Sequence, residues 1–357
     1  MSDAEVLVVG AGPAGCAAAT ALARGGRRVI LLEREVTPRE SVCGEFLGPD
    51  AAAALARLGL DLPALGAVPI RSVRVAAGRR NAAAPLPFSA WGLPRRLLDS
   101  ALQAAAVSSG AVLRHGAAVS ADRAEDRWRV RLRDGAVVTA PALVLATGKH
   151  GLRGHPRRHG RGTATGLKLH LPGLETGGAV ALLPFLGGYA GLQPTVGGAN
   201  LCAALWGDPG PAARGPDAFL ARVAGGSALA ARLLAGAQPD WDRPLAVAGV
   251  PYGFLHRPEP GDPPGLYRVG DQAAVVPSFT GDGMAMALHG GLAAAAAILA
   301  GQGADRFHAA WAGRARRPMG WAAVVGGVLR HAPGLLALGA RLPALPALVA
   351  RRTRVAA

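Results

Sequence analysis

A glycine-rich turn near the N-terminus constrains the fold more than any other feature of the sequence. The turn reads Gly10-Ala11-Gly12-Pro13-Ala14-Gly15 and follows a short apolar run, residues 6–9. An alanine-rich stretch with helical character continues to residue 24, and a second apolar run over residues 28–33 ends in Glu33. A strand, a glycine turn, a helix and a second strand in this order predict a βαβ unit of the Rossmann-like kind, which binds dinucleotides.

Each glycine of the turn has its own expected task. Gly10 permits the tight turn, Gly12 lets the backbone approach a diphosphate, and Gly15 lets the helix pack closely on the strand. The helix's free N–H groups and dipole favour phosphate at its start. Glu33 can accept both ribose hydroxyl hydrogens and would repel a 2′-phosphate, so the unit suits FAD or NAD better than NADP. The cofactor contacts expected here are Gly10, Gly12, Pro13, Ala14, Gly15, Glu33 and Arg34.

A second motif distinguishes between these two cofactors. Arg268-Val269-Gly270-Asp271 is followed by Pro277 and then by Thr280-Gly281-Asp282-Gly283-Met284. This order resembles the glycine–aspartate motif of the superfamily that contains flavoprotein monooxygenases of the para-hydroxybenzoate hydroxylase type and geranylgeranyl reductases. The resemblance implies FAD, with Asp271 at its ribityl chain and Gly281, Gly283 and Met284 beside it. A helix beginning near Gly283 would direct its positive end at the flavin and stabilise the charge of the reduced ring.

Three further stretches resemble the same superfamily. In Leu93-Pro94-Arg95-Arg96-Leu97-Leu98-Asp99, the resemblance implies that Arg95 contacts the FAD diphosphate, although an arginine at a helix start is also common on surfaces. Ala146-Thr147-Gly148 resembles the strand end that abuts the dinucleotide. Cys43-Gly44 resembles a turn that geranylgeranyl reductases carry near the flavin. The expected FAD contacts therefore also include Cys43, Gly44, Arg95, Val119, Thr147 and Gly148.

The resemblance also implies the fold class, an α/β (overall α+β) chain with a Rossmann-like FAD-binding domain of the glutathione-reductase-like type, an inserted β-sheet substrate domain and a helical C-terminus. We expect residues 1–70, 94–155 and 255–320 to form the FAD-binding domain. Residues 71–93 and 156–254 would form the substrate domain, and residues 321–357 the C-terminal segment. Local patterns predict a hairpin over residues 128–139, a helix over residues 216–234 and short helices after residue 321.

The formal net charge of +16 raises the question of nucleic-acid binding. Basic residues are scattered, however, aromatic residues make up only 4% of the chain, and no nucleic-acid-binding module is recognisable. We therefore expect no nucleic-acid partner. The three cysteines lie at irregular spacing, the N-terminus is acidic, unlike a secretion signal, and no uninterrupted apolar run reaches about 20 residues, so we expect a cytoplasmic protein.

Three residues near the motifs are catalytic candidates. Cys43 could donate a proton, interact with the flavin as a thiolate, or simply fit a tight loop. Glu45 could relay protons if burial raises its pKa, or it could form a salt bridge with Arg39. Tyr189 lies in a stretch that looks like a sheet segment over the flavin, where its hydroxyl could bind a phenol or carbonyl, or it could be a packed core residue. The sequence leaves these alternatives open.

The stretch after residue 148 departs from the superfamily's monooxygenases, many of which carry an Asp-Gly motif for FAD and NAD(P)H there. This chain has Lys149 and a basic run, which could receive an anionic substrate or simply be solvated; the run includes Arg157, Arg158 and Arg161. His155 and His159 stand four residues apart, but Pro156 argues against a helix and no other ligand completes a set, so we expect no metal. The Trp-x-Trp-x-Ile-Pro run of flavin-dependent halogenases is not evident.

The resemblance implies an enzyme, foremost a monooxygenase. NADH or NADPH would act as external reductant, and oxygen would form a flavin C4a-hydroperoxide that hydroxylates an apolar aromatic or polyketide-like molecule. A geranylgeranyl-reductase-type saturase of isoprenoid double bonds is the alternative, favoured by the Cys43-Gly44 turn. A third is a prenyl-binding protein of the escort or dissociation-inhibitor type, without catalysis. Apolar stretches beside arginines after Trp321 would also suit peripheral contact with a membrane or lipid.

Overall fold

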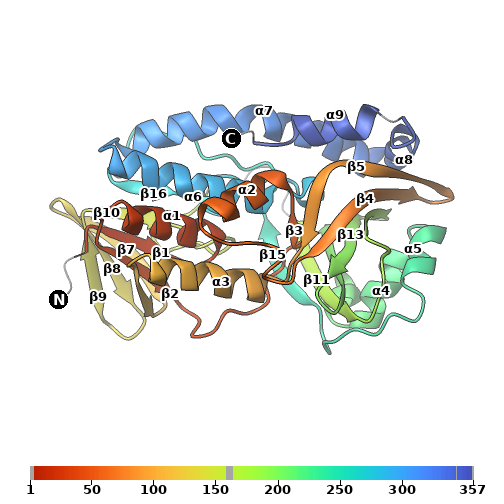
Figure 1. Cartoon of the computed structure of the whole chain (residues 1–357), viewed down its shortest axis with the longest axis horizontal. Coiled ribbons are helices and arrows are strands. Elements are labelled where there is room, and N and C mark those ends of the chain that lie inside the picture. Colours follow the sequence, from red (N-terminus) through yellow and green to blue (C-terminus); the bar gives the residue numbers. More distant parts are fainter. Residues whose placement is uncertain (1–3, 158–163, 343, 356–357) are drawn as a thin grey trace.

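The computed structural model describes residues 4–157, 164–342 and 344–355, and shows an elongated molecule with two large sheets at opposite ends (Figure 1). The first sheet has five parallel strands in the order β16-β10-β1-β2-β6. Its strands are β1 (Val6–Val9), β2 (Val29–Glu33), β6 (Val112–His115), β10 (Ala142–Leu145) and β16 (Leu266–Arg268). The chain moves outward from β1 to β6 and then returns to β10 on the other side of β1. Ligands bind at such a reversal, outside the carboxyl ends of the strands.

The two faces of the parallel sheet are covered differently, as the period of two along a strand requires. Val6 and Val8 face a core formed with three helices, α1 (Pro13–Arg24), α3 (Arg95–Ser108) and α6 (Gly283–Leu299). Leu7 and Val9 face Trp128 and Val130 of a small antiparallel sheet. Its strands are β7 (Ala118–Ala124), β8 (Arg127–Leu132) and β9 (Val137–Ala140), so the predicted hairpin is confirmed. The Rossmann-like fold class is confirmed as well.

The second sheet has eight strands in the order β15-β11-β14-β13-β12-β4-β5-β3. They are β3 (Phe46–Leu47), β4 (Val68–Ala77), β5 (Arg80–Gly92), β11 (Ala164–Pro172), β12 (Ala179–Phe185), β13 (Gly188–Thr195), β14 (Gly198–Trp206) and β15 (Leu245–Val250). Leu169, Leu183 and Leu201 on one face pack with Phe219 of α4 (Pro216–Ala224) and with α5 (Ala228–Leu233). Strands from residues 68–92 therefore join those from residues 164–250 in one sheet.

The single helix predicted over residues 216–234 is wrong, because α4 ends at Gly225-Gly226. Two glycines in succession weaken a helix, and the Ser227 hydroxyl then caps α5 by accepting a hydrogen bond from the Ala230 N–H at 3.1 Å. Short helices do follow residue 321, namely α8 (Pro333–Gly339) and α9 (Ala344–Arg352), but the expected start of the C-terminal segment falls within a longer helix. Helix α7 (Ala304–His331) runs through residue 321 and through Pro318.

The C-terminal segment lies along one side of the molecule and joins both halves (Figure 1). It contains α7, α8 (Pro333–Gly339) and α9 (Ala344–Arg352). Helix α2 (Pro49–Arg57) belongs to the half that contains the parallel sheet. Leu335, Leu338 and Leu342 are 57%, 52% and 60% exposed, so apolar side chains face outward near α8. The expected lipid contact stays a prediction. Within the described ranges, no single helix has the length and apolar character to cross a membrane, whereas α7 and α8 taken together, bent by 115°, meet that criterion.

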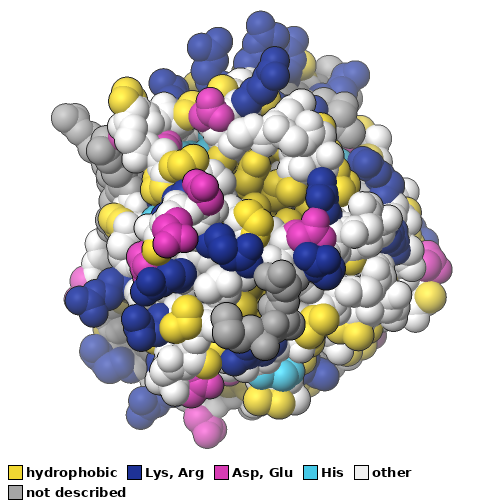
Figure 2. Space-filling view, turned by 90° about the vertical axis from the view of Figure 1, so that its left-hand side faces the viewer, with side chains coloured by type: hydrophobic (Ala, Val, Ile, Leu, Met, Phe, Trp, Pro, Cys, Tyr) yellow, Lys and Arg dark blue, Asp and Glu magenta, His cyan; other side chains and the backbone are white. Residues whose placement is uncertain are grey.

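Basic side chains do not gather in one place on the end of the molecule that carries the parallel sheet. Figure 2 shows Lys and Arg spread among acidic and neutral side chains on this face. Several of the arginines pair locally, as Arg27 does with Glu5 at 2.9 Å and Arg39 with Glu35 at 2.8 Å. On this face the positive charge is therefore distributed, not concentrated in a stripe.

Candidate functional site

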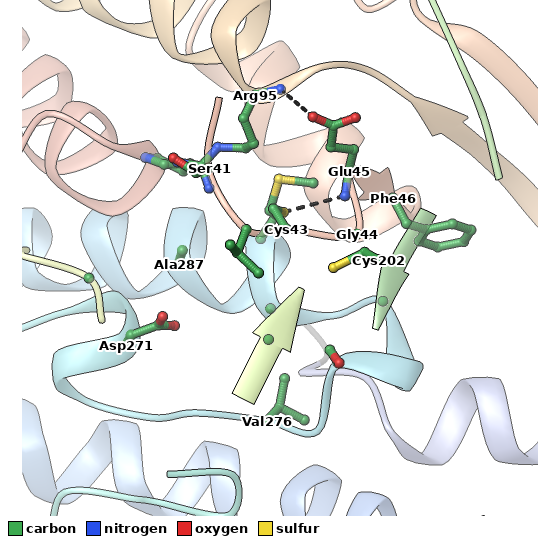
Figure 3. A pocket seen from close by; sticks show the side chains of 18 of the residues that line it. Ser41, Cys43, Gly44, Glu45, Phe46, Arg95, Cys202, Asp271, Val276 and Ala287 are labelled. Carbon is green, nitrogen blue, oxygen red and sulfur yellow. Dashed lines mark hydrogen bonds between the residues drawn. The ribbon is translucent and has the colours of Figure 1, made fainter. Parts of the chain in front are cut away.

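One cavity of about 920 Å³ extends from the glycine turn to the C-terminal helices. At one end it is lined by the turn after β1, by Glu33 and by the start of α6. At the other end it is lined by apolar side chains of β4, β12, α8 and α9, among them Val73, Val75, Leu182, Leu336 and Leu345. Residues 41–46 lie between these ends (Figure 3). A single space therefore joins the two sheets, with a polar and an apolar end.

The glycine turn has the geometry that the sequence predicts. Gly10 has φ of +105°, and a Cβ there would lie 2.4 Å from the Ala146 carbonyl oxygen. A Cβ on Gly15 would lie 1.8 Å from the Gly10 oxygen, so only glycine allows α1 to approach the turn. A Cβ on Gly12 would instead meet only the Arg95 Nη2 at 3.6 Å, which is ordinary contact. Packing of the chain therefore does not require glycine at position 12, and the absence of a side chain leaves space beside the turn.

Glu33 is held at the mouth of this turn. Its Oε2 accepts a hydrogen bond from the Ala11 N–H at 2.8 Å, and its Oε1 accepts from the N–H groups of Arg34 and Glu35 at 2.9 and 3.1 Å. Glu33 and Arg34 both line the cavity. Each carboxylate oxygen has further lone pairs, so Glu33 is fixed in orientation and can still accept hydrogen bonds from ribose hydroxyls.

Arg95 lies beside the glycine turn, close to Gly12. Its Nε and Nη2 donate to the two carboxylate oxygens of Asp99 at 3.0 and 2.7 Å. Burial opposes the charge of the guanidinium, but Asp99 outweighs burial and raises the pKa of Arg95. Arg95 lines the cavity beside Gly12. A permanent positive charge therefore lies where a diphosphate would approach the helix start.

The second motif lies on the opposite side of the same cavity. Asp271 lines it, with the Lys149 ammonium 3.7 Å from its carboxylate, and Gln272 donates to the carbonyl oxygens of Gly148 and His150 at 2.8 Å. Gly281 has φ of +74° and directs the chain into α6. Thr147, Gly148, Gly281, Gly283 and Met284 also line the cavity. The glycine turn after β1, the stretch after β10 and the second motif thus all line the same cavity.

The basic stretch after Gly148 is partly built into the site. Lys149 donates to the Val42 carbonyl oxygen at 3.0 Å, and buried Arg157 donates to the carbonyl oxygens of Asp271 and Lys149. These two residues are structural links, not a solvated run. Arg158, His159 and Arg161 lie outside the described residues.

The Cys43-Gly44-Glu45 turn projects into the middle of the cavity (Figure 3). The Asn200 side-chain amide donates to the carbonyl oxygens of Cys43 and Gly44 at 3.1 and 2.9 Å, and the Glu45 N–H donates to the Cys43 sulfur at 3.3 Å. Glu45 has φ of +59°, a left-handed conformation that is costly for a side chain of its size. The turn is therefore held in one strained shape by groups from a distant strand.

Glu45 is fully buried among charged partners. Its Oε1 accepts from the Lys168 ammonium at 2.5 Å and from the Arg95 N–H at 2.9 Å, and its Oε2 lies 3.0 Å from the His170 Nε2. Burial alone would raise the pKa of Glu45, but the hydrogen bond with His170 and the charge of Lys168 outweigh it and lower the pKa to about 2. The expected pairing with Arg39 is wrong, because Arg39 pairs with Glu35. The expected rise in the pKa of Glu45 is also wrong, because His170 and Lys168 stabilise the ionised carboxylate.

Two other predicted residues lie outside the cavity lining. Tyr189 is buried, and its hydroxyl lies 2.6 Å from the Ser278 Oγ. Val119 is 37% exposed and is not a lining residue, whereas its neighbours Gly116, Ala117 and Ala118 are. Tyr189 therefore contacts the cavity through two lining residues, Ser278 and Phe279, and Val119 lies just beyond the lining residue Ala118.

Several site residues escaped sequence reasoning because strand register brings them in. On one face of the second sheet, Lys168 pairs with Cys202 and His170 with Asn200, and Asn200 in turn pairs with Gln193. The Gln193 Nε2 is buried, lines the cavity and has no hydrogen-bond partner among the described residues. Lys168 and His170 alternate with leucines in the sequence, which is the one signal that marks a polar face on this strand.

Among the residues that the structure describes, two groups of side chains have the spacing of metal ligands, and neither was anticipated. In the first, which comprises Glu40, Glu45 and His170, the Lys168 ammonium donates to both carboxylates and already supplies positive charge. In the second, His256 and Asp262 lie near His308, whose Nε2 accepts a hydrogen bond from the Arg268 N–H at 2.9 Å. The expectation of no metal stays a prediction.

The residues present fit FAD by three observations. A Cβ on Gly44, Gly148 or Gly283 would meet nothing within 4 Å, so backbone is open to the cavity at all three. The orphaned Gln193 amide supplies a buried donor. Glu33, Arg95 and the start of α6 supply groups for a ribose, a diphosphate and an anionic ring.

Asp282, directly before α6, should make stability depend on pH. It is buried and its Oδ2 lacks a partner among the described residues. Burial raises its pKa to about 7, against the opposing charge of Arg354, which lies 4.0 Å away. The folded state therefore holds the proton more tightly, and stability falls as pH rises from about 4 to about 7. Replacing Asp282→Asn should remove this fall.

The measurement is the difference in Tm between the variant and the natural protein across this pH range, without added FAD. The difference should grow by about 2 °C or more from pH 4.5 to 7.5, because one kcal/mol corresponds to about that shift in a chain of this size. Parallel Tm curves would contradict the assigned pKa.

Comparisons with known proteins also indicate an FAD site. Residues 5–38 match the family described as FAD dependent oxidoreductase. Menaquinone reductase of Mycolicibacterium smegmatis is 33% identical over 153 residues, which are 41% of this chain and 37% of that protein. Squalene epoxidase of Schizosaccharomyces pombe is 41% identical over 58 residues, 16% of this chain and 13% of that protein. The chain thus spans well under half the length of these relatives.

The likeness to solved structures extends over nearly the whole chain. Flavin-dependent brominase Bmp2 superposes with a TM-score of 0.80 at 20% identity and covers 99% of this chain and 93% of its own. A flavoprotein/dehydrogenase of Cytophaga hutchinsonii superposes with a TM-score of 0.79 at 18% identity, over 98% and 92% of the two chains. At these identities the superpositions show the fold alone.

Proposed function

Because this chain belongs to the FAD-dependent flavoprotein superfamily, we propose that it is an FAD-dependent oxidoreductase that acts on an apolar small molecule. One observation carries this proposal. The cavity that contains both glycine motifs continues into an apolar end lined by Val73, Val75, Leu182 and Leu336. Bound FAD would supply the redox chemistry. The chain would hold the cofactor at Glu33, Arg95 and Asp271 and keep water from the apolar end.

Reduction of the substrate by the flavin is the reaction that we favour. The match to menaquinone reductase extends over 153 residues, well beyond the dinucleotide unit, whereas the match to squalene epoxidase covers only 58. The Cys43-Gly44-Glu45 turn lies inside the cavity, as the geranylgeranyl reductase resemblance implies. With Glu45 held ionised by Lys168 and His170, Cys43 is the nearer candidate for a proton donor, and Glu45 positions the turn.

Monooxygenation is the second candidate, supported by the squalene epoxidase match and by the apolar end of the cavity. In both reactions NADH or NADPH would be the external reductant. The two differ in the electron acceptor, an alkene or quinone in the first and molecular oxygen in the second.

Anaerobic turnover separates these candidates. Purified holoenzyme is reduced with dithionite in the absence of oxygen and freed of excess dithionite by gel filtration, because dithionite itself reduces quinones. It is then mixed with a prenylated naphthoquinone, and the product is identified by mass spectrometry. A reductase should form a product that has gained hydrogen without oxygen, and protein prepared without FAD serves as the control. Product that appears only with oxygen, and contains one more oxygen atom, would establish the monooxygenase instead.

Absorbance tests the third alternative, a prenyl-binding protein without catalysis. An FAD enzyme should be yellow and absorb near 450 nm. A protein that stays colourless after incubation with FAD would favour the binding role.

A further inference from the structure

Three hydroxyl groups meet at the apolar end of the cavity. The Tyr252 hydroxyl donates to the Ser278 Oγ at 3.0 Å, and the Tyr189 hydroxyl lies 2.6 Å from the same oxygen. The Tyr189 oxygen also accepts a hydrogen bond from the Phe279 N–H at 3.2 Å. Ser278 and Tyr252 line the cavity, and Tyr189 lies behind them.

The direction of these hydrogen bonds follows from counting protons. A tyrosine hydroxyl has one proton to donate. The acceptor that the structure gives Tyr189 among the described residues is the Ser278 Oγ, since its contact with Phe279 uses the tyrosine oxygen as acceptor. Burial raises the pKa of both tyrosines, which keeps both hydroxyls protonated, and a Tyr189 proton directed at Ser278 gives this buried hydroxyl an acceptor. Ser278 thus accepts two hydrogen bonds, and its own proton is left to point elsewhere.

We propose that the Ser278 hydroxyl donates a hydrogen bond into the cavity and selects apolar substrates that carry a carbonyl or phenolate oxygen. Ser278 is exposed, lines the cavity, and donates to no acceptor among the described residues once both tyrosines donate to it. Two incoming hydrogen bonds polarise its O–H bond and strengthen it as a donor. The inference rests on the proposed function and adds a substrate class to it.

The surroundings place this donor beside the apolar part of the cavity. Tyr189, Tyr252 and Phe279 pack in one cluster with Leu182 and Leu336. The ring of Tyr189 meets the ring of Phe279 edge to face, with centroids 6.0 Å apart. Ser278 also lies three residues before Gly281 in the second FAD motif. A substrate oxygen bound at Ser278 would therefore lie at the apolar end, on the side nearer the second FAD motif.

The test compares two ligands in the natural protein and in three variants. Holoenzyme with oxidised FAD is titrated with 1,4-naphthoquinone and with 2-methylnaphthalene, which lacks the oxygens, and binding is followed by the flavin spectrum. Ser278→Ala should weaken binding of the quinone about fivefold and leave the hydrocarbon unchanged, since one hydrogen bond is lost. Ser278→Thr keeps a hydroxyl and should retain the preference. Tyr252→Phe, which removes one polarising donor, should weaken quinone binding to a smaller extent.

FAD content is measured in every sample and reports on the proposed function separately. A variant that keeps full FAD content and an unchanged ratio of the two ligand affinities would overturn the role of Ser278. Equal weakening of both ligands would do the same, because it would indicate a general change in the cavity. Protein that binds no FAD would refute the proposed function itself, and the ligand ratio would then be read from tryptophan fluorescence.

Discussion

Gly12→Ala is expected to leave the fold intact and to remove most of the bound FAD, whereas Gly15→Ala is expected to prevent folding. A Cβ on Gly12 meets only the flexible end of Arg95 at 3.6 Å, but it would occupy space that a diphosphate needs next to the turn. A Cβ on Gly15 would lie 1.8 Å from a backbone oxygen, which cannot move without opening the turn. Overpacking usually lowers the free energy of unfolding by about 1–3 kcal/mol, and a clash with backbone should cost at least the upper value.

The measurements are the ratio of absorbance at 450 nm to that at 280 nm after incubation with FAD, and the Tm of the protein without cofactor. Gly12→Ala should lose at least about tenfold in FAD affinity, as expected when a close backbone contact is blocked. Its Tm without FAD should stay within about 2 °C of the natural value. Full FAD content in this variant would show that the diphosphate does not approach the turn.

Lys168→Met should destabilise the protein by about 3–5 kcal/mol, the cost of leaving a buried charge unpaired. Lys168 is fully buried and its ammonium donates to Glu40 at 2.7 Å and to Glu45 at 2.5 Å. Burial by itself would lower the pKa of Lys168, but these two carboxylates raise it. With methionine in its place, Glu45 keeps His170 and the Arg95 N–H as partners but loses its strongest neutralising charge.

Urea unfolding of the protein without FAD measures this effect, and two further variants control it. Lys168→Met combined with Glu45→Gln should recover most of the loss, because no buried charge is then left unpaired. Arg39→Met breaks the exposed pair with Glu35 and should cost less than about 1 kcal/mol. A loss in the double variant as large as in Lys168→Met would show that the lysine acts through packing and not through charge.

The dinucleotide unit could be predicted from the sequence because its chemistry is local. The turn requires Gly10, Gly12 and Gly15 at these positions, and Glu33 ends the next strand. The spacing of these residues along the chain is therefore enough to predict the unit. The second motif, with Asp271 and Gly283, could be recognised only by its resemblance to a superfamily. Nothing in its spacing indicates that it lies beside the glycine turn after β1 in the folded chain. The fold class followed from these two motifs together.

The surroundings of Cys43 could not be predicted, because they depend on strand register across long separations. Asn200 lies 157 residues after Cys43 in the chain, and Lys168 lies 123 residues after Glu45. Pairing of β11 with β14 brings their polar side chains to one face, and no local pattern fixes that pairing. The sequence did show alternation of Lys168 and His170 with leucines. The single helix predicted over residues 216–234 failed because Gly225-Gly226 ends α4.

Helix α7 has a consequence for how the two halves of the molecule can move. Its 28 residues extend over about 42 Å. Phe307 and Trp311 near its start belong to the core around the parallel sheet, while Leu329 near its end packs with Tyr189 and Ala204 of the second sheet. One continuous strut is therefore anchored in both cores, and it sets the width of the space between them. Separating the two sheets would therefore require α7 to bend or to lose its contacts with one of the two cores.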